Sequence, residues 1–260
     1  MKKAVILGGS SGIGLALGKE LLNEGYSLLI ASRNKEKLDA AKTELNAIKK
    51  VEIDTFCCDI LDDNSIKELA DFTNEWSGGL VDLLVYSIGD IECDDWNKLS
   101  IDDQKHVMDV NYWGAVKSTT ALYPYIINTK GSILFISSVA GFMGLYGYTG
   151  YSPSKHALTG WAECLRMEAA VKRVKIHVAF PGDTTTPMLK KEREMSLPET
   201  KAINAGVKEK SPEQVAAKIL NGVKRGKYNI YSDNESPLIR IFKAVMPNFF
   251  HRKLDKMAKK

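Results

Sequence analysis

Short apolar runs alternate along the chain with longer segments in which apolar residues recur at helical spacing. The apolar runs predict strands at 3 to 7, 27 to 31, 51 to 57, 81 to 85, 131 to 137, 174 to 180 and 227 to 231. Helices are expected between them, because strands that alternate with amphipathic segments build parallel β-α-β units. The pattern therefore predicts an α/β fold, a doubly wound parallel sheet flanked by helices on both faces.

Length and composition fit one folded unit. The chain has 260 residues, 44% of them hydrophobic and 26% charged, without a repeat or a linker. We expect residues 1–235 to form the main domain and 236–260 a basic, partly apolar C-terminal extension. Two helix starts are indicated locally, at Asp62 and at Ser211 before Pro212, because a polar residue there precedes helical apolar spacing.

A glycine-rich turn follows the first predicted strand and opens a helix. Its sequence is Gly8-Gly9-Ser10-Ser11-Gly12-Ile13-Gly14, which has the spacing G-x-x-x-G-x-G rather than G-x-G-x-x-G. Glycines let backbone N–H groups and the helix N-terminus come close to a pyrophosphate. The turn therefore predicts a dinucleotide site, and the alternative is a glycine turn needed only for tight packing.

A second motif places a phenol and an ammonium group on one helix face. Tyr151 and Lys155 are four residues apart, and Ser138 lies thirteen residues upstream of the tyrosine. A nearby cation favours the phenolate, so we expect Lys155 to lower the pKa of Tyr151 and make it a usable general acid or base. Alone, the pair is equally typical of a solvated helix surface.

The ordered set of Gly8 to Gly14, Asn111, Ser138, Tyr151 and Lys155 resembles the short-chain dehydrogenase/reductase family. The resemblance implies a single Rossmann-type domain, a nicotinamide cofactor and these last four residues as the catalytic set. It implies that Ser138 and Tyr151 hold a ketone oxygen, that Tyr151 donates the proton, and that Lys155 contacts the nicotinamide ribose. Asn111 is implied to hold a proton-relaying water; from the residues alone it equally suits a helix position bonded to backbone.

Two positions depart from the family pattern. Leu7 stands where the family usually has threonine, and Tyr86-Ser87-Ile88-Gly89 stands where it usually has Asn-Asn-Ala-Gly. Both positions support the cofactor, so they bear on its affinity more than on the chemistry.

Charge at the end of the second strand favours NADP(H) over NAD. No acid stands there to bind a ribose 2′-hydroxyl, whereas Arg33 and Lys37 offer cations to a 2′-phosphate. An ordinary solvated helix start is the alternative. Asp59 suits either an adenine contact or a helix-start residue. The residues expected at the cofactor are Gly8, Ser10, Ser11, Gly12, Ile13, Gly14, Arg33, Lys37, Asp59, Ile60, Ser87, Gly89, Tyr151, Lys155, Pro181, Gly182 and Thr184.

Apolar residues next to the expected site indicate a hydrophobic ketone as substrate. The segment Val139 to Tyr148 is rich in large apolar groups, and about half of them are expected to pack the core instead. The stretch Pro187 to Ser211 mixes apolar and charged residues and predicts a mobile lid. Residues 112–127 and 153–170 are where the family builds homodimers and homotetramers.

Segments of the C-terminal half resemble one branch of the family, the 3-ketodihydrosphingosine reductases. They are Gly144 to Lys155, Phe180 to Pro187, Leu197 to Thr200 and Ser211 to Ala216. The resemblance implies NADPH-dependent reduction of the 3-keto group of a long-chain sphingoid base. Eukaryotic members carry an N-terminal membrane segment, whereas this chain begins at its first strand. The alternatives are a reductase of 3-oxoacyl or other small carbonyl substrates and a catalytically idle NADP-binding module.

The excess positive charge lies in the tail. Residues 236–260 hold seven Lys or Arg and one acid, a formal +6, whereas the whole chain carries +4. Apolar residues with basic flanks predict either contact with an anionic membrane surface or a terminal helix that covers the core or a dimer partner.

Other classes are disfavoured. The four cysteines and four histidines have no metal-ligand spacing, so no metal is assigned. Basic and aromatic residues do not alternate on a strand, which argues against nucleic acid. The absence of a signal peptide or a long apolar span makes the cytoplasm the expected location.

Overall fold

The computed structural model describes residues 1–259 and contains one seven-stranded parallel sheet. The strand order is β3-β2-β1-β4-β5-β6-β7. The strands are β1 (Lys2–Leu7), β2 (Tyr26–Ser32), β3 (Ile53–Cys57), β4 (Leu83–Tyr86), β5 (Ser132–Ile136), β6 (Lys175–Phe180) and β7 (Asn229–Tyr231). All seven predicted strands are present with ends within two residues of the predicted ones, which confirms the doubly wound α/β fold.

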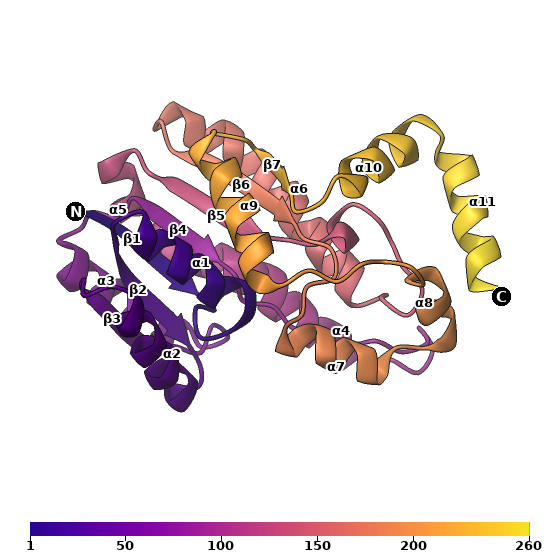
Figure 1. Cartoon of the computed structure of the whole chain (residues 1–260), viewed down its shortest axis with the longest axis horizontal. Coiled ribbons are helices and arrows are strands. Elements are labelled where there is room, and N and C mark those ends of the chain that lie inside the picture. The colour runs from indigo at the N-terminus through magenta and orange to yellow at the C-terminus, as the bar shows by residue number, and fades with distance from the viewer. Residues whose placement is uncertain (260) are drawn as a thin grey trace.

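Helices cover both faces of the sheet (Figure 1). On one face lie α1 (Gly12–Asn23), α2 (Lys35–Ile48) and α9 (Pro212–Lys224), which pack with the sheet around Leu17, Leu38 and Ile219. On the other face lie α3 (Asp63–Ser77), α5 (Gly114–Thr129) and α6 (Tyr151–Val171).

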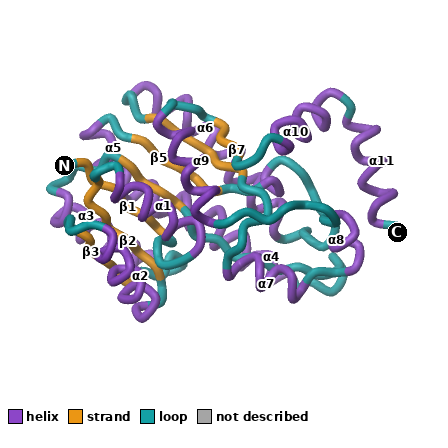
Figure 2. Tube along the Cα trace, in the orientation of Figure 1, coloured by secondary structure: helices purple, strands orange, loops and turns teal. Residues whose placement is uncertain are grey.

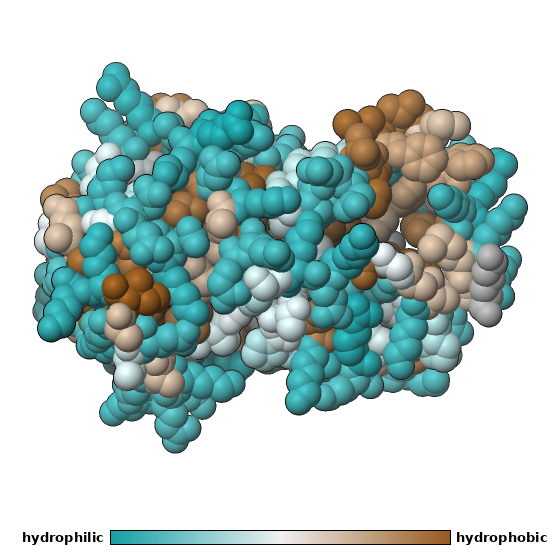
Figure 3. Space-filling model, viewed as in Figure 1, coloured by the Kyte–Doolittle hydropathy of each residue, from teal (hydrophilic) through white to brown (hydrophobic). Residues whose placement is uncertain are grey.

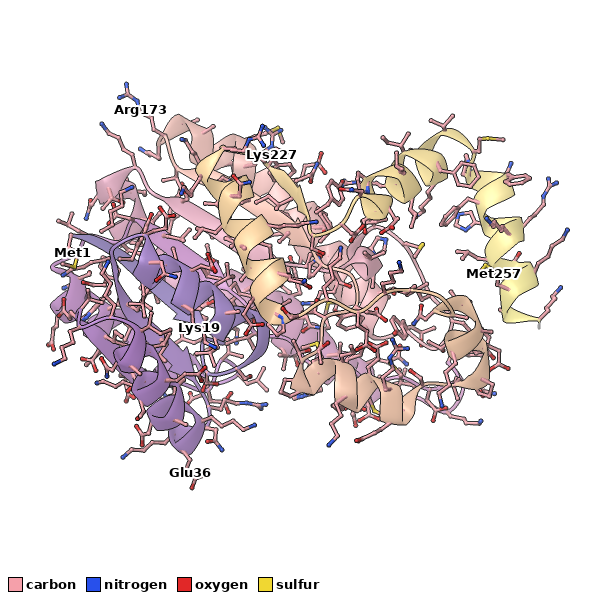
Figure 4. The ribbon with its side chains drawn as sticks, in the orientation of Figure 1. Met1, Lys19, Glu36, Arg173, Lys227 and Met257 are labelled. Carbon is pink, nitrogen blue, oxygen red and sulfur yellow. The ribbon has the colours of Figure 1, made fainter. Side chains whose placement is uncertain are left out.

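Polar contacts join the helices of the first face and fix two predicted helix starts. Lys19 on α1, labelled in Figure 4, lies 2.5 Å from Glu44 on α2 and 3.8 Å from Glu213 on α9. The Asp62 side chain accepts from the Asn64 N–H at 2.9 Å, so Asp62 is the N-cap of α3 as predicted. Ser211 caps α9 and forms a capping box with Gln214.

The remaining helices extend beyond the carboxyl ends of the strands, on the right of Figures 1 and 2. They are α4 (Ile101–Met108), α7 (Pro187–Met195), α8 (Pro198–Ile203), α10 (Glu235–Val245) and α11 (Pro247–Ala258). Two short turns complete the described helices, the π-helical turn η1 (Asp109–Trp113) and the 3₁₀ turn η2 (Val139–Gly141). After β3 the chain crosses the sheet to place β4 beside β1. Ligands of open α/β sheets bind at such a reversal of strand order.

Candidate active site

A cavity of about 1060 Å³ lies along the carboxyl edge of the sheet. One end is lined by the glycine turn after β1 and by the end of β2. The other end is lined by α7, the loop after α8, α10 and α11, and Tyr151, Ser138 and Lys155 lie on its wall. The fold therefore brings the two sequence motifs into one chamber.

The glycine turn is built for close backbone approach. Gly8 has φ +87°, and a Cβ atom there would lie 2.8 Å from the backbone of Ser87 and Ile88. A Cβ atom on Gly14 would lie 2.2 Å from the Gly8 carbonyl oxygen, so only glycine fits at this position, which lies behind the turn. Ser11, the N-cap of α1, makes no side-chain capping bond, and the first turn of α1 has no acid. Its first N–H groups can therefore receive an anion.

Cations lie where β2 ends. Arg33 and Lys37 are exposed and line the cavity, and neither pairs with an acid among residues 1–259. Ser32 also lines it, and its buried hydroxyl oxygen has no hydrogen-bond partner in that part of the chain. Unpaired cations and an unsatisfied hydroxyl fit a phosphorylated ribose.

Most of the predicted cofactor residues line the cavity, and two do not. Asp59 is exposed and accepts from the Leu61 N–H at 3.0 Å, which matches its alternative interpretation as a residue before a helix. Gly14 lies behind the turn, as described above. The predicted residues that line the cavity are Gly8, Ser10, Ser11, Gly12, Ile13, Arg33, Lys37, Ile60, Ser87, Gly89, Tyr151, Lys155, Pro181, Gly182 and Thr184.

Helix α6 and the turn η2 hold the predicted catalytic groups together. Tyr151 is the first residue of α6, and Lys155 follows one turn later with its ammonium nitrogen 5.7 Å from the centre of the Tyr151 ring. Ser138 lies two residues beyond the end of β5 and caps η2 by accepting from the Ala140 N–H. Lys155 is 3% exposed and donates to the Ile136 carbonyl at 3.2 Å.

Burial reverses the pKa shift predicted for the tyrosine. Desolvation raises the pKa of the Tyr151 phenol above its ordinary value, and the adjacent Ser138 hydroxyl only opposes that shift. Desolvation also lowers the pKa of Lys155 to about 8. The net pKa shift of Tyr151 is therefore opposite to the predicted one, because desolvation of the buried phenol dominates it.

Asn111 lies behind the cavity rather than on its wall. It is fully buried in η1 and donates to the Asp90 carbonyl at 2.8 Å and to the Ser154 hydroxyl at 2.9 Å. Its side-chain oxygen accepts from the Asp90 N–H at 2.8 Å. Asn111 thereby joins the segment after β4 to α6, and it bonds backbone as its alternative interpretation expected.

The apolar segment after Ser138 divides between the site and the core. Met143, Leu145 and Tyr148 line the cavity, whereas Phe142 packs against Phe180 and Tyr231. This division is the one expected from the sequence. The stretch predicted as a lid forms α7 and α8, and Met188 and Leu189 of α7 line the cavity.

Two parts of the wall were not found from the sequence. The inner sides of α10 and α11 contribute Ile239, Phe242, Phe250, Leu254 and Met257, of which Met257 is labelled in Figure 4. Their amphipathic pattern signalled a buried face but not what it covers. Glu192 on α7 also lines the cavity and accepts a hydrogen bond from the Tyr148 hydroxyl. It is one of several charges on α7, and the sequence does not distinguish it.

Comparisons with known proteins agree with this geometry. The family model described as short chain dehydrogenase matches residues 2–197. A 3-ketodihydrosphingosine reductase of Dictyostelium discoideum is 33% identical, covering 98% of this chain and 81% of that protein. A 3-dehydrosphinganine reductase of Danio rerio is 35% identical, covering 86% and 69%. The solved structure of a variant actinorhodin polyketide ketoreductase with NADPH has a TM-score of 0.79 at 26% identity and covers 88% and 94%.

The family match spans most of the chain, and the relatives share more than 30% identity over most of their length. The chain belongs to the short-chain dehydrogenase family of oxidoreductases and is most like the 3-ketodihydrosphingosine reductases.

Proposed function

We propose that the protein reduces a ketone to a secondary alcohol with NADPH, and that its substrate is the 3-keto group of a long-chain sphingoid base. The observation that carries the proposal is the shape of the cavity: one chamber joins the glycine turn to an apolar end, with Tyr151 and Ser138 between them. Curated relatives named for this reaction support the substrate.

Each group of the site has a defined task in this proposal. The Ser138 hydroxyl and the Tyr151 phenol bind the carbonyl oxygen, and Tyr151 donates its proton to that oxygen as the alcohol forms. NADPH, when bound, supplies the hydride that the carbonyl carbon receives. Lys155 would contact the nicotinamide ribose, and Asn111 keeps α6 and the segment after β4 in register. The raised pKa of Tyr151 keeps its phenol protonated, as a proton donor requires.

Arg33 and Lys37 are the groups proposed to select NADPH. Their side chains face the cavity without an acidic partner in the described chain, so a 2′-phosphate gains two cations, whereas NAD gains neither. A solved relative with NADPH supports this preference.

The substrate end suits a long apolar chain. It is lined by side chains from three separate helices and from the segment after Ser138, among them Met143, Leu189 and Phe242. Burial of each methylene group contributes about 0.8 kcal/mol, so a long alkyl chain binds such a wall far better than a short acyl group does.

The test is NADPH oxidation by purified protein with 3-ketodihydrosphingosine in detergent, compared with NADH and with a short 3-oxoacyl thioester. We expect turnover of the sphingoid ketone with NADPH, and we expect Arg33→Ala to lower kcat/KM for NADPH about 10-fold or more while leaving the NADH rate unchanged. Turnover of the thioester alone would replace the substrate with a small carbonyl compound. Turnover of neither would favour the idle binding module.

We further propose that α10 and α11 contact an anionic membrane surface. Leu238, Ile241, Val245, Met246 and Phe249 are exposed, and Figure 3 shows apolar side chains gathered over α10. Arg252, Lys253 and Lys256 on α11 are exposed next to this apolar face, and their charge complements anionic lipid. No helix among residues 1–259 is long and apolar enough to cross a membrane, so the contact is proposed as peripheral.

Co-sedimentation with vesicles tests the membrane contact. We expect binding to vesicles that contain phosphatidylserine, weaker binding to neutral vesicles, and a loss of about 10-fold or more for the double variant Ile241→Ser, Val245→Ser. Unchanged sedimentation of the variant, or none by the wild type, would contradict this contact and leave the reductase proposal unaffected.

A further inference from the structure

Glu192 on the cavity wall has no cationic partner and a single hydrogen-bond donor in the described part of the chain. Glu192 projects from α7, the helix that covers the substrate end, and it is partly buried. Its side chain accepts a hydrogen bond from the Tyr148 hydroxyl. No lysine, arginine or histidine forms an ion pair with it among residues 1–259. Burying a carboxylate is unfavourable unless a cation or several donors compensate it.

The neighbouring acids of the cavity are already compensated. Asp90 lies 2.9 Å from the Lys191 ammonium group, and Asp183 lies 2.6 Å from the Arg193 guanidinium group. The two cations that flank Glu192 in the sequence are thus both engaged elsewhere. Asp233 accepts hydrogen bonds from the backbone and hydroxyl of Ser236. Glu192 therefore differs from them in having only one neutral donor.

Glu192 also lies close to the reacting groups. The Tyr148 ring that binds it packs edge-on against the Tyr151 ring, with 5.8 Å between ring centres. Its charge contributes to the raised pKa of Tyr151. Burial in turn raises the pKa of Glu192 above its ordinary value, although the Tyr148 hydrogen bond opposes this shift. A cation bound to Glu192 would thus be separated from the Tyr151 ring only by the Tyr148 side chain.

We propose that Glu192 is a specificity-determining residue that binds the ammonium group of a 2-amino ketone. The inference rests on the proposed function, and it adds the recognition of a charge. In a sphingoid base the amine is attached to the carbon next to the keto carbon, so a ketone held by Ser138 and Tyr151 presents its amine close by. A 3-oxoacyl group has no cation at that position and leaves the Glu192 carboxylate uncompensated.

The charge-neutral variant Glu192→Gln isolates this role. Glutamine keeps the size of the side chain and an acceptor for the Tyr148 hydroxyl, so the cavity wall is retained. Glu194→Gln is the matched control, because it removes the same charge from an exposed position on α7, two residues away. Both variants are assayed with NADPH on 3-ketodihydrosphingosine and on the chain-matched hydroxyketone that lacks the amine.

We expect Glu192→Gln to lower kcat/KM for the amino ketone by about 10- to 100-fold, mainly through a higher KM. The amine-free ketone should change less than about threefold, since it forms no charged contact, and Glu194→Gln should match the wild type on both. Equal losses of Glu192→Gln on both ketones would assign Glu192 a structural role, and no loss on either would remove it from substrate binding. Each of these results overturns the inference.

The wild-type data keep the two proposals apart. If the wild type reduces the amino ketone and the selective loss is missing, the Glu192 inference fails and the proposed function stands. If the wild type reduces only the amine-free ketone or the thioester, the sphingoid substrate fails, and the ammonium site fails with it.

Discussion

Burial of Lys155 destabilises the fold at a position proposed for the active site. Its side chain is 3% exposed and donates one hydrogen bond, to the Ile136 carbonyl. A buried cation with so few partners loses more hydration than it regains, and desolvation accordingly lowers the pKa of Lys155 to about 8. Active sites commonly accept such a penalty in exchange for function.

Lys155→Met is expected to stabilise the protein in the absence of nucleotide while abolishing reduction. The folded-state pKa of Lys155 lies below the unfolded one. The free-energy cost of burying the charged lysine is therefore complete below about pH 8 and disappears as pH rises toward about 10.4. At pH 7 the variant should gain about 1–3 kcal/mol in free energy of unfolding. Urea unfolding at pH 7 and pH 10 measures both values. A variant that is less stable at pH 7, or a gain that does not shrink at pH 10, would contradict this effect of burial.

Residue types alone do not show whether burial or a neighbouring charge dominates the pKa of a site residue. Tyr151, Lys155 and Ser138 were all predicted for the site and all lie on the cavity wall, because the motif spacing fixes them on one helix and one strand end. The direction of the Tyr151 pKa shift was not predictable, since it depends on how completely the fold removes water. Asp59 was ambiguous for a related reason: a short acid after a strand suits a ligand or a turn equally well.

At the scale of elements, α7 is held over the cavity by ion pairs at both of its faces. The Lys191 ammonium group lies 2.9 Å from Asp90 and 2.5 Å from Glu92, both in the segment after β4. The Arg193 guanidinium group lies 2.6 Å from Asp183 and 3.3 Å from Glu209. These contacts connect α7 to the segments after β4 and β6 and to the segment before α9, and they hold it over the cavity.

Lys191→Ala is expected to loosen α7 and raise the KM for the long-chain ketone about three- to tenfold, because partly exposed ion pairs contribute about 1 kcal/mol. Limited proteolysis between residues 187 and 211 should become faster, with little change in the melting temperature. Lys190→Ala serves as the control, since Lys190 is the exposed neighbour on the same helix. Unchanged KM and proteolysis in Lys191→Ala would show that the ion pairs do not hold the lid.

Elements with a strong local pattern were predicted well, and those defined by packing were not. The seven strands and the starts of α3 and α9 follow from apolar runs and capping residues, which act over a few positions. The π-helical turn η1 around Asn111 has no such local signal. The inner faces of α10 and α11 were recognisable as apolar, but only the folded chain places them on the cavity.

At the scale of the whole molecule, the cavity brings together residues from opposite ends of the chain. The glycine turn and the end of β2 lie within the first 37 residues, and α10 and α11 contribute the last wall. The sheet brings these parts together, because all its strands are parallel and end on the same side. The tail thus has one face on the cavity and another with exposed apolar groups, and the second face is the one proposed to contact a membrane.

Label transfer tests the central claim most directly. The protein is incubated with 3-ketodihydrosphingosine and NADPH that carries deuterium at the transferable hydride position, and the lipid product is analysed by mass spectrometry. We predict sphinganine with one deuterium on the former keto carbon, and no product from Tyr151→Phe under the same conditions. Unlabelled or unreduced lipid from the wild type, under conditions in which the protein is folded and binds NADPH, would contradict the proposed reduction.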